Sequence, residues 1–155
     1  MKASPRIILI RLFLSLALAI TGKELLAQPY MHSVGVRAGY SSGVTYKAFR
    51  LHRMGAYEGS ILYNRHGFNL SALYEHHLEP VRNERFLVFA GGGAFGGDWN
   101  EEFSLGIIGV VGIEYTIRDI PLNLAVDWRP MFNIIQSTEL DLLDFGFSIR
   151  YRFGS

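Results

Sequence analysis

The sequence predicts an all-β fold, a closed antiparallel up-and-down β-barrel of about eight strands. Three observations predict it. Apolar and polar residues alternate over short runs, which is typical of strands with one polar face. The 155 residues include 17 glycines, and 14% of the residues are aromatic. Beyond residue 27 no apolar run is long enough to cross a bilayer as a helix, so the apolar residues are spread over many short segments.

The alternating runs come first, because they are the clearest strands. Residues 33–40 (SVGVRAGY) and 43–49 (GVTYKAF) carry apolar side chains at every second position, and Ser41-Ser42-Gly43 between them is a turn signal. The same alternation recurs in residues 122–129 (LNLAVDWR) and in the last run, residues 144–153 (DFGFSIRYRF). Period two with branched and aromatic residues predicts a strand in each run.

Four less regular segments complete the predicted sheet. Residues 56–63, 68–76 and 105–117 alternate in part, whereas residues 85–93 are predicted from β-propensity and spacing alone. Turn signals separate these segments at Asn64–Gly67 and Arg118–Pro121. Two connections are expected to be long, Gly92–Phe103 and Met131–Asp141.

The polar face of the strands carries five basic and five acidic residues. In a closed barrel with its apolar face outward, these side chains meet inside one narrow lumen. Buried charges must be paired, since isolating one is costly, and a balanced set makes pairing possible. The residues expected to form this lumen charge network are Arg37, Lys47, Glu58, Glu75, Glu114, Asp127, Arg129, Asp144, Arg150 and Arg152.

The positions of aromatic residues favour this orientation over a soluble barrel or lipocalin, which also alternates. If the N-terminus starts in the periplasm, ten aromatic residues fall near the two rims of the outward face, with aliphatic residues between them. Two such girdles around an apolar band are typical of outer-membrane barrels. The outer rim is expected to hold Tyr40, Tyr63, Phe68, Trp128 and Phe145, and the inner rim Tyr57, Tyr74, Tyr115, Tyr151 and Phe153.

The N-terminus predicts export. Residues 1–27 combine a basic start, an apolar core and a plausible cleavage site after Ala27, which is the pattern of a secretory signal peptide. Residues 28–155 then form one barrel domain. The whole chain has 15 basic and 14 acidic residues, of which the leader holds four and one, so the mature chain carries a net charge of −2. The mature sequence has no basic patch of the kind that would predict a nucleic-acid partner. The absence of cysteine excludes disulfides and a lipidated cysteine.

The C-terminal run resembles a known signal. Its pattern of a polar residue, a glycine and then alternating apolar and aromatic residues is similar to the last strand of bacterial outer-membrane β-barrels. The mature chain resembles their small members, of OmpA/OmpX-like architecture. The resemblance implies an outer-membrane location and recognition by the barrel-assembly machinery, and it implies no catalytic residue. The assembly signal is expected at Asp144, Gly146, Ile149, Tyr151 and Phe153.

Three short motifs match functional patterns without the structural context that these require. Gly39–Gly43 matches G-x-S-x-G, but a strand follows where a nucleophile elbow needs a helix. Gly91–Gly96 contains G-x-G-x-x-G and also lacks a following helix, which predicts a strand end and loop. Residues 98–102 have the spacing that opens a calcium loop but not its later glycine and glutamate, so a solvated loop is expected.

Together these features predict a non-catalytic outer-membrane barrel with a structural or surface-interaction role, needing no cofactor or metal. Its expected partners are outer-membrane lipid, lipopolysaccharide and the assembly machinery, and it is expected to be a monomer. Two alternatives stay open. One is small-solute binding or transport, although eight strands leave little room inside. The other is a lipid-A- or phospholipid-modifying enzyme, with His66 in one outer turn and Ser41 and Ser42 in another.

Overall fold

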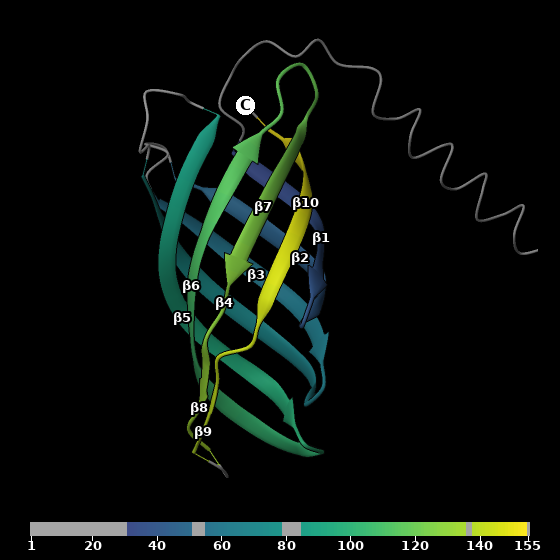
Figure 1. Ribbon diagram of the computed structural model, residues 1–155, viewed down its shortest axis with the longest axis vertical. Coiled ribbons are helices and arrows are strands. Elements are labelled where there is room, and N and C mark those ends of the chain that lie inside the picture. The colour runs from purple at the N-terminus through teal and green to yellow at the C-terminus, as the bar shows by residue number, and fades with distance from the viewer. Residues whose placement is uncertain (1–30, 51–54, 79–84, 136–137, 155) are drawn as a thin grey trace, which may run out of the picture.

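The computed structural model describes residues 31–50, 55–78, 85–135 and 138–154, and these form one closed sheet (Figure 1). The predicted leader at residues 1–27 lies outside the described residues. The strands are β1 (His32–Gly39), β2 (Ser42–Phe49), β3 (Gly55–Asn64), β4 (Gly67–Leu78), β5 (Phe86–Trp99), β6 (Glu102–Thr116), β7 (Leu122–Trp128), β8 (Met131–Asn133), β9 (Glu139–Asp141) and β10 (Phe145–Phe153).

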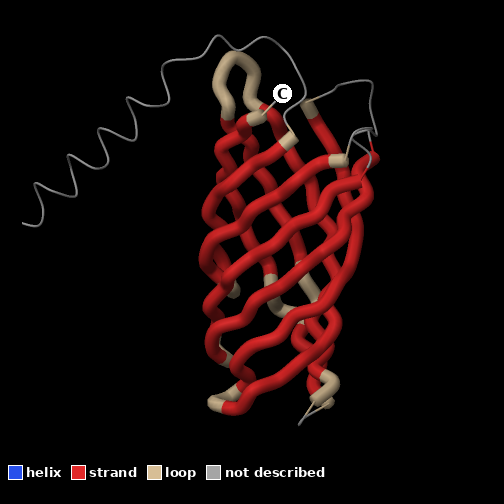
Figure 2. Tube along the Cα trace, turned by 180° about the vertical axis from the view of Figure 1, so that it is seen from behind, coloured by secondary structure: helices blue, strands red, loops and turns tan. Residues whose placement is uncertain are grey.

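Every strand pairs antiparallel with its neighbours, and the sheet closes on itself. The spatial order is β5-β4-β3-β2-β1-β10-β7-β6, and the β5–β6 pairing closes the ring. Seen from behind, the strands wrap obliquely around a common axis (Figure 2). β8 continues the path of β7, and β9 leads into β10. Counting each of these pairs as one wall strand, the barrel has eight wall strands. The predicted closed, up-and-down, all-β barrel is therefore confirmed.

The wall strand made of β7 and β8 is interrupted at Arg129 and Pro130. Both halves pair with β6 in one register, Trp128 opposite Val111 and Met131 opposite Ile108. The break occurs because proline has no N–H to donate to a ladder. On the neighbouring wall strand, made of β9 and β10, the three residues 142–144 lie opposite only Arg129 and Pro130. The extra residue makes a β-bulge between β9 and β10.

The segment Gly92–Phe103 corrects one prediction, since it is not a long connection. β5 and β6 run through it and meet in a two-residue turn at Asn100 and Glu101, both with positive φ. The glycines of β5 belong to the barrel wall, because a Cβ on Gly93 would collide with the backbone carbonyl of Ala72 on β4. A run that looked flexible in the sequence is thus a close approach of two strands.

The second expected long connection, Met131–Asp141, is also partly strand. β8 and β9 pair with each other across it, Met131 opposite Asp141 and Asn133 opposite Glu139. Because β8 continues the wall strand beyond Trp128, Trp128 lies opposite the middle of β6 and not at the rim where it was expected. Phe145, its cross-strand partner, is placed the same way.

Inward and outward side chains differ sharply in chemistry. Along β3 and β4, buried and exposed residues alternate almost without a break. The largest fully buried side chains of the described residues include Arg37, Lys47, Arg129 and Arg150, whereas valine, isoleucine, leucine and aromatic residues dominate the exposed face. A smaller apolar cluster around Phe89 and Phe95 fills the lumen beside β5 and β6. Among the described residues no helix is long and apolar enough to cross a membrane.

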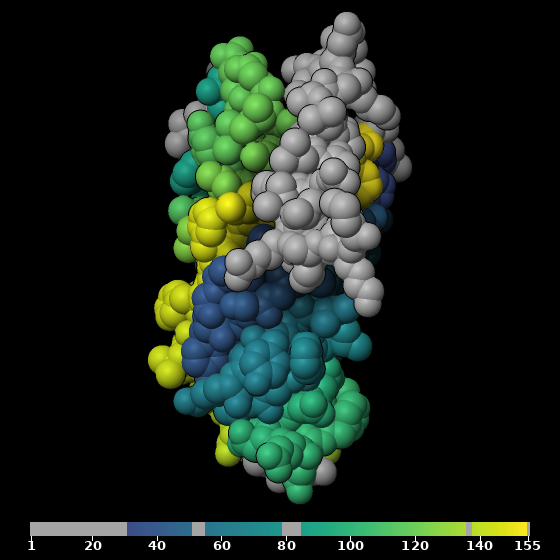
Figure 3. Space-filling view, turned by 90° about the vertical axis from the view of Figure 1, so that its right-hand side faces the viewer, coloured from purple at the N-terminus to yellow at the C-terminus, as the bar shows by residue number. Residues whose placement is uncertain are grey.

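The barrel has two distinct ends. His32 lies opposite Phe153, so the first and last strands begin and finish at the same end, which we call the terminal end. β2, β4 and β6 end at this end too, and β3, β5 and β7 begin there (Figure 1). The hairpins β1–β2, β3–β4, β5–β6 and β8–β9 lie at the opposite, distal end (Figure 1), and the β5–β6 hairpin forms the lower tip of the molecule in Figure 3.

Candidate functional site

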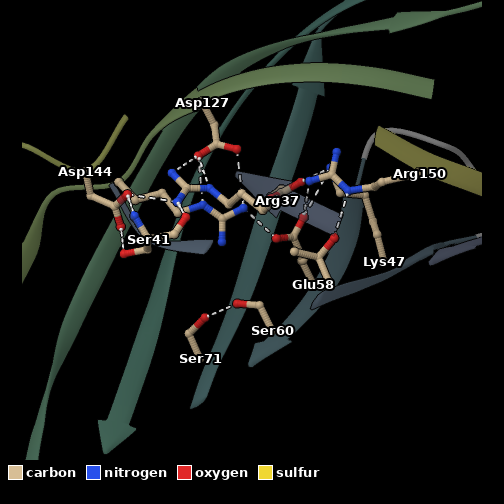
Figure 4. Close-up of polar contacts among 12 residues, drawn as sticks. Arg37, Ser41, Lys47, Glu58, Ser60, Ser71, Asp127, Asp144 and Arg150 are labelled. Atoms are coloured by element: carbon tan, nitrogen blue, oxygen red, sulfur yellow. Dashed lines mark hydrogen bonds and ion pairs between the residues drawn. The ribbon is translucent and has the colours of Figure 1, made fainter. Parts of the chain in front are cut away.

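The candidate functional site is a network of ion pairs that fills the lumen (Figure 4). Strand parity places its side chains there, since every second residue of a strand points to the same face. Of the ten residues predicted to line the lumen, nine are buried and ion-paired inside the barrel. Each is at most 1% exposed, so the network is shielded from bulk solvent.

Arg37 on β1 organises the distal part of the network. Its Nε and Nη2 donate to Asp127 Oδ1 at 3.0 and 2.7 Å, and its Nη1 donates to Asp144 Oδ1 at 2.8 Å. The same Nη1 donates to the backbone oxygen of Ser41 at 2.7 Å. One guanidinium therefore ties β1 to β7 and to the segment preceding β10, across the seam where the first and last strands meet.

Glu58 on β3 is the centre of the network. Arg129 Nη2 donates to its Oε1 at 2.6 Å and Arg150 Nη2 to its Oε2 at 2.9 Å. Arg129 also donates through Nε to Asp127 Oδ1 at 2.9 Å, which joins this part to the Arg37 part. Both carboxylate oxygens of Glu58 thus accept charged hydrogen bonds, the strong class of such contacts.

Lys47 on β2 meets three carboxylates. Its Nζ lies 2.7 Å from Glu75, 3.0 Å from Glu114 and 3.6 Å from Glu58. The ammonium also stands over the ring of Phe89, 4.5 Å from its centroid. A cation that is desolvated in this way is held by charge and by the ring face together.

Arg152, the tenth predicted residue, is placed differently. It is half-buried at the terminal end, where its Nη2 donates to the backbone oxygens of Ile120 at 2.9 Å and Ile117 at 3.4 Å. The nine buried residues therefore comprise four cations and five carboxylates.

His77 is also part of this site, although it was not among the ten residues predicted to line the lumen. Its Nε2 lies 3.7 Å from Glu75 and 3.9 Å from Glu114, between the rings of Phe49 and Phe89. His76, next to it, is exposed. The same strand parity that predicted the arginines marks His77 as an inward residue, so this signal was present in the sequence.

A second polar cluster lies at the distal end. Asp141 Oδ2 accepts from the hydroxyl of Tyr40 at 2.7 Å and lies 3.2 Å from His66 Nε2. The ring of His66 stacks on Trp99, 4.1 Å between centroids, and Trp99 Nε1 donates to Glu139 at 2.7 Å. These contacts fasten the β8–β9 hairpin to the turns of the other hairpins.

The environment of this cluster changes two pKa values. Burial and the hydrogen bond to Asp141 raise the pKa of Tyr40 to about 12. Burial acts to raise the pKa of Asp141, but hydrogen bonds from the backbone of Leu143, from Tyr40 and from His66 outweigh it and hold this pKa below its usual value. Asp141 therefore accepts these hydrogen bonds as a carboxylate.

The serines and the histidine considered for a lipid-modifying enzyme have separate partners. The hydroxyl of Ser41 donates to Asp144 Oδ2 at 2.7 Å, and that of Ser42 contacts the backbone of Gly39 at 3.2 Å. His66 instead faces Asp141 and Asn100. Among the described residues, these contacts form no serine–histidine pair that would activate a nucleophile.

The three motif matches fall on strands and turns. Gly39–Gly43 spans the β1–β2 turn, Gly91–Gly96 lies inside β5, and residues 98–102 form the tip of the β5–β6 hairpin. In the part of the chain that the structure describes, no group of three or more histidine, cysteine, aspartate or glutamate residues could hold a metal ion.

Comparison with protein-family models, with curated proteins and with solved structures finds no match for the chain. Fold and site together define the class: a closed eight-stranded antiparallel β-barrel with an ion-paired lumen and an apolar exterior.

Proposed function

We propose that the chain is a non-catalytic, monomeric integral protein of the bacterial outer membrane, with a structural or surface-interaction role and a lumen closed by its charge network. One observation carries the proposal, namely that charge is inside and apolar surface outside. Arg37, Arg129 and Arg150 are among the largest fully buried side chains, whereas Val36, Ile61 and Leu70 are at least half exposed. In water this distribution is unfavourable, and in hydrocarbon it is the favourable one.

Closure of the sheet supports the same proposal. A bilayer core offers no water to backbone groups, so a sheet that spans it must have no free edge. Here β1 pairs with β10 over eight residue pairs, and β5 pairs with β6 along its whole length. Aromatic pairs on the outer face, Tyr57 with Tyr74 and Tyr63 with Phe68, stand near opposite ends of β3 and β4, as interfacial girdles do.

The proposal includes export and assembly. We propose that residues 1–27 direct secretion and that β10 carries the signal read by the barrel-assembly machinery. The outward residues of β10 suit recognition from the lipid side, since Ile149 and Phe153 are exposed. Gly146 and Asp144 point inward instead, where Asp144 pairs with Arg37.

A closed lumen is the proposed state because ion pairs span it. Glu58 and Lys47 from one wall meet Arg129, Arg150 and Glu114 from the other. Eight-stranded barrels have an interior just wide enough for side chains. Contacts with outer-membrane lipid and lipopolysaccharide then take place on the exterior and at the distal hairpins.

Fractionation followed by a heat-modifiability gel tests the membrane location. We expect the protein in the outer-membrane fraction, with boiled and unboiled samples migrating differently. Recovery of the monodisperse protein from periplasmic extract without detergent contradicts the proposal. In planar bilayers the folded protein should show no steady conductance, whereas stable open channels would support the small-solute alternative.

A further inference from the structure

The charged residues outside the lumen are divided between the two ends of the barrel. At the terminal end most of the charged side chains that the structure describes are basic, and Asp119 is the one exposed acid among them. Arg50 and Arg118 are exposed there, and Arg85 and Arg152 are half-buried.

The distal end has the opposite sign. Among its described residues Arg65 is the one exposed base. The exposed acids at this end are Asp98, Glu101, Glu102 and Glu139. They lie close together, because Asp98, Glu101 and Glu102 stand at the tip of the β5–β6 hairpin and Glu139 accepts a hydrogen bond from Trp99 of the same hairpin.

The terminal bases adjoin the apolar band directly. Arg85 precedes Phe86, which is exposed and lies opposite Tyr115. The backbone of Thr116 donates to Arg85 O at 2.8 Å, and Arg152 Nη2 donates to Ile120 O at 2.9 Å, so both arginines flank the turn that carries Arg118. Cations at the edge of an aromatic band occupy the headgroup layer when the band lies in acyl chains.

From this arrangement we infer that the terminal end binds the anionic headgroups of a phospholipid leaflet, an inference that rests on the proposed membrane location. Guanidinium groups suit the phosphate of such a headgroup, because their planar N–H donors match its oxygens in pairs. The distal acids have the sign that phosphate repels. This polarity favours one orientation, with the terminal end toward the phospholipid leaflet.

Local charge and net charge make different predictions about anionic lipid. The mature chain expected from the sequence has a net charge of −2, so net charge alone predicts weak repulsion from an anionic surface. Local contact at the terminal end predicts attraction instead. Each Arg near an anionic surface strengthens binding about fivefold, and the effect fades with added salt.

The test uses vesicles of phosphatidylcholine and vesicles whose outer monolayer alone also contains phosphatidylglycerol. The full mature barrel is refolded from the outside, and its unfolding by urea is followed by gel shift. Arg118→Glu and Arg65→Glu change the net charge equally at opposite ends. We expect phosphatidylglycerol to raise the wild-type folding constant at low salt, and Arg118→Glu to reduce that increase at least about fivefold, the contribution of one arginine. Arg65→Glu should keep the increase.

Three results overturn the inference. The first is a wild-type folding constant that phosphatidylglycerol leaves unchanged. The other two are an equal loss of the increase in both variants and a loss of the increase in Arg65→Glu alone. If Arg118→Glu does not refold, Arg50→Glu replaces it at the same end. A chain that forms a heat-modifiable barrel in both vesicle types without lipid preference contradicts this inference alone. A chain that folds in neither vesicle contradicts the proposed membrane function itself.

Discussion

Gly146 lies against the guanidinium of Arg37, so that a Cβ at this position would overlap Cζ, Nε and Nη2 of that side chain. Because Gly146 has no side chain, the guanidinium of Arg37 can occupy this space beside β10 and reach both Asp127 and Asp144. Gly146 was predicted from the sequence as part of an assembly signal. Its position gives a second reason for a glycine here, because the missing side chain leaves space for the ion pairs of Arg37 at the seam.

Replacing this glycine should therefore weaken the seam. We expect Gly146→Ala to lower the free energy of unfolding by about 1–3 kcal/mol, because the added methyl displaces the guanidinium of Arg37. Urea unfolding of the barrel refolded in detergent micelles measures this. Gly59→Ala is the matched control, because a Cβ built at Gly59 has no heavy atom within 4 Å apart from those of its own residue and its two chain neighbours. Equal stability of the two variants would contradict the role assigned to Gly146.

Glu58 provides the test of the network as a whole. Glu58→Gln keeps the shape of the side chain but removes the charge that faces Arg129, Arg150 and Lys47. This substitution takes the nearest acidic partner from both Arg129 and Arg150, so we expect a loss of about 3–5 kcal/mol in the free energy of unfolding.

The control for this substitution lies two residues along the same strand. Ser60 also points inward, but it makes a neutral hydrogen bond with Ser71 at 2.5 Å (Figure 4). Ser60→Ala should cost only about 1 kcal/mol. If Glu58→Gln costs no more than Ser60→Ala in the same urea titration, the ion pairs do not hold the lumen together.

Val126 tests whether the apolar face meets lipid. It is 48% exposed on β7, between Phe147 and Ile113 on the flanking strands. We expect Val126→Arg to cost about 2–4 kcal/mol in a bilayer, as for arginine at the midplane of a lipid-facing strand. Leu78→Arg, at the terminal end of β4, should cost about 0–1 kcal/mol because the headgroup layer is within reach. Similar small costs at both positions in vesicles would mean that this face does not meet acyl chains.

The sequence predicted the two faces of the barrel well, because strand parity is a local property. Arg37, Lys47 and Glu58 each stand at a polar position of an alternating run, and alternation alone sends them inward. Their partners were not predictable. Which arginines meet Glu58 depends on the register between strands far apart in the sequence, and nothing local encodes that register.

Two other features were hidden for a different reason. The glycines of β5 read as a loop, since glycine is common in flexible segments and its close contact with Ala72 appears only in the folded sheet. The strand predicted at residues 122–129 was expected to lead into a long connection from Met131, but the ladder resumes beyond Pro130 in the same register at Met131. Long-range pairing outweighs local propensity in both cases.

Asp141 makes the attachment of the β8–β9 hairpin dependent on pH. Its folded pKa is lower than its usual value of 3.8, so ionised Asp141 stabilises the folded hairpin above that pH. This stabilisation is lost as the pH falls through the folded pKa, when the carboxylate is protonated. Trp99 reports the change, because it stacks on His66 and donates to Glu139 on the same hairpin. In a Trp128→Phe background, we expect the fluorescence of Trp99 to change as the pH falls below about 4, and Asp141→Asn to show the acid-like signal already at neutral pH. An unchanged neutral spectrum in Asp141→Asn would mean that the hairpin is held without this carboxylate, by the Trp99–Glu139 contact and the β8–β9 ladder.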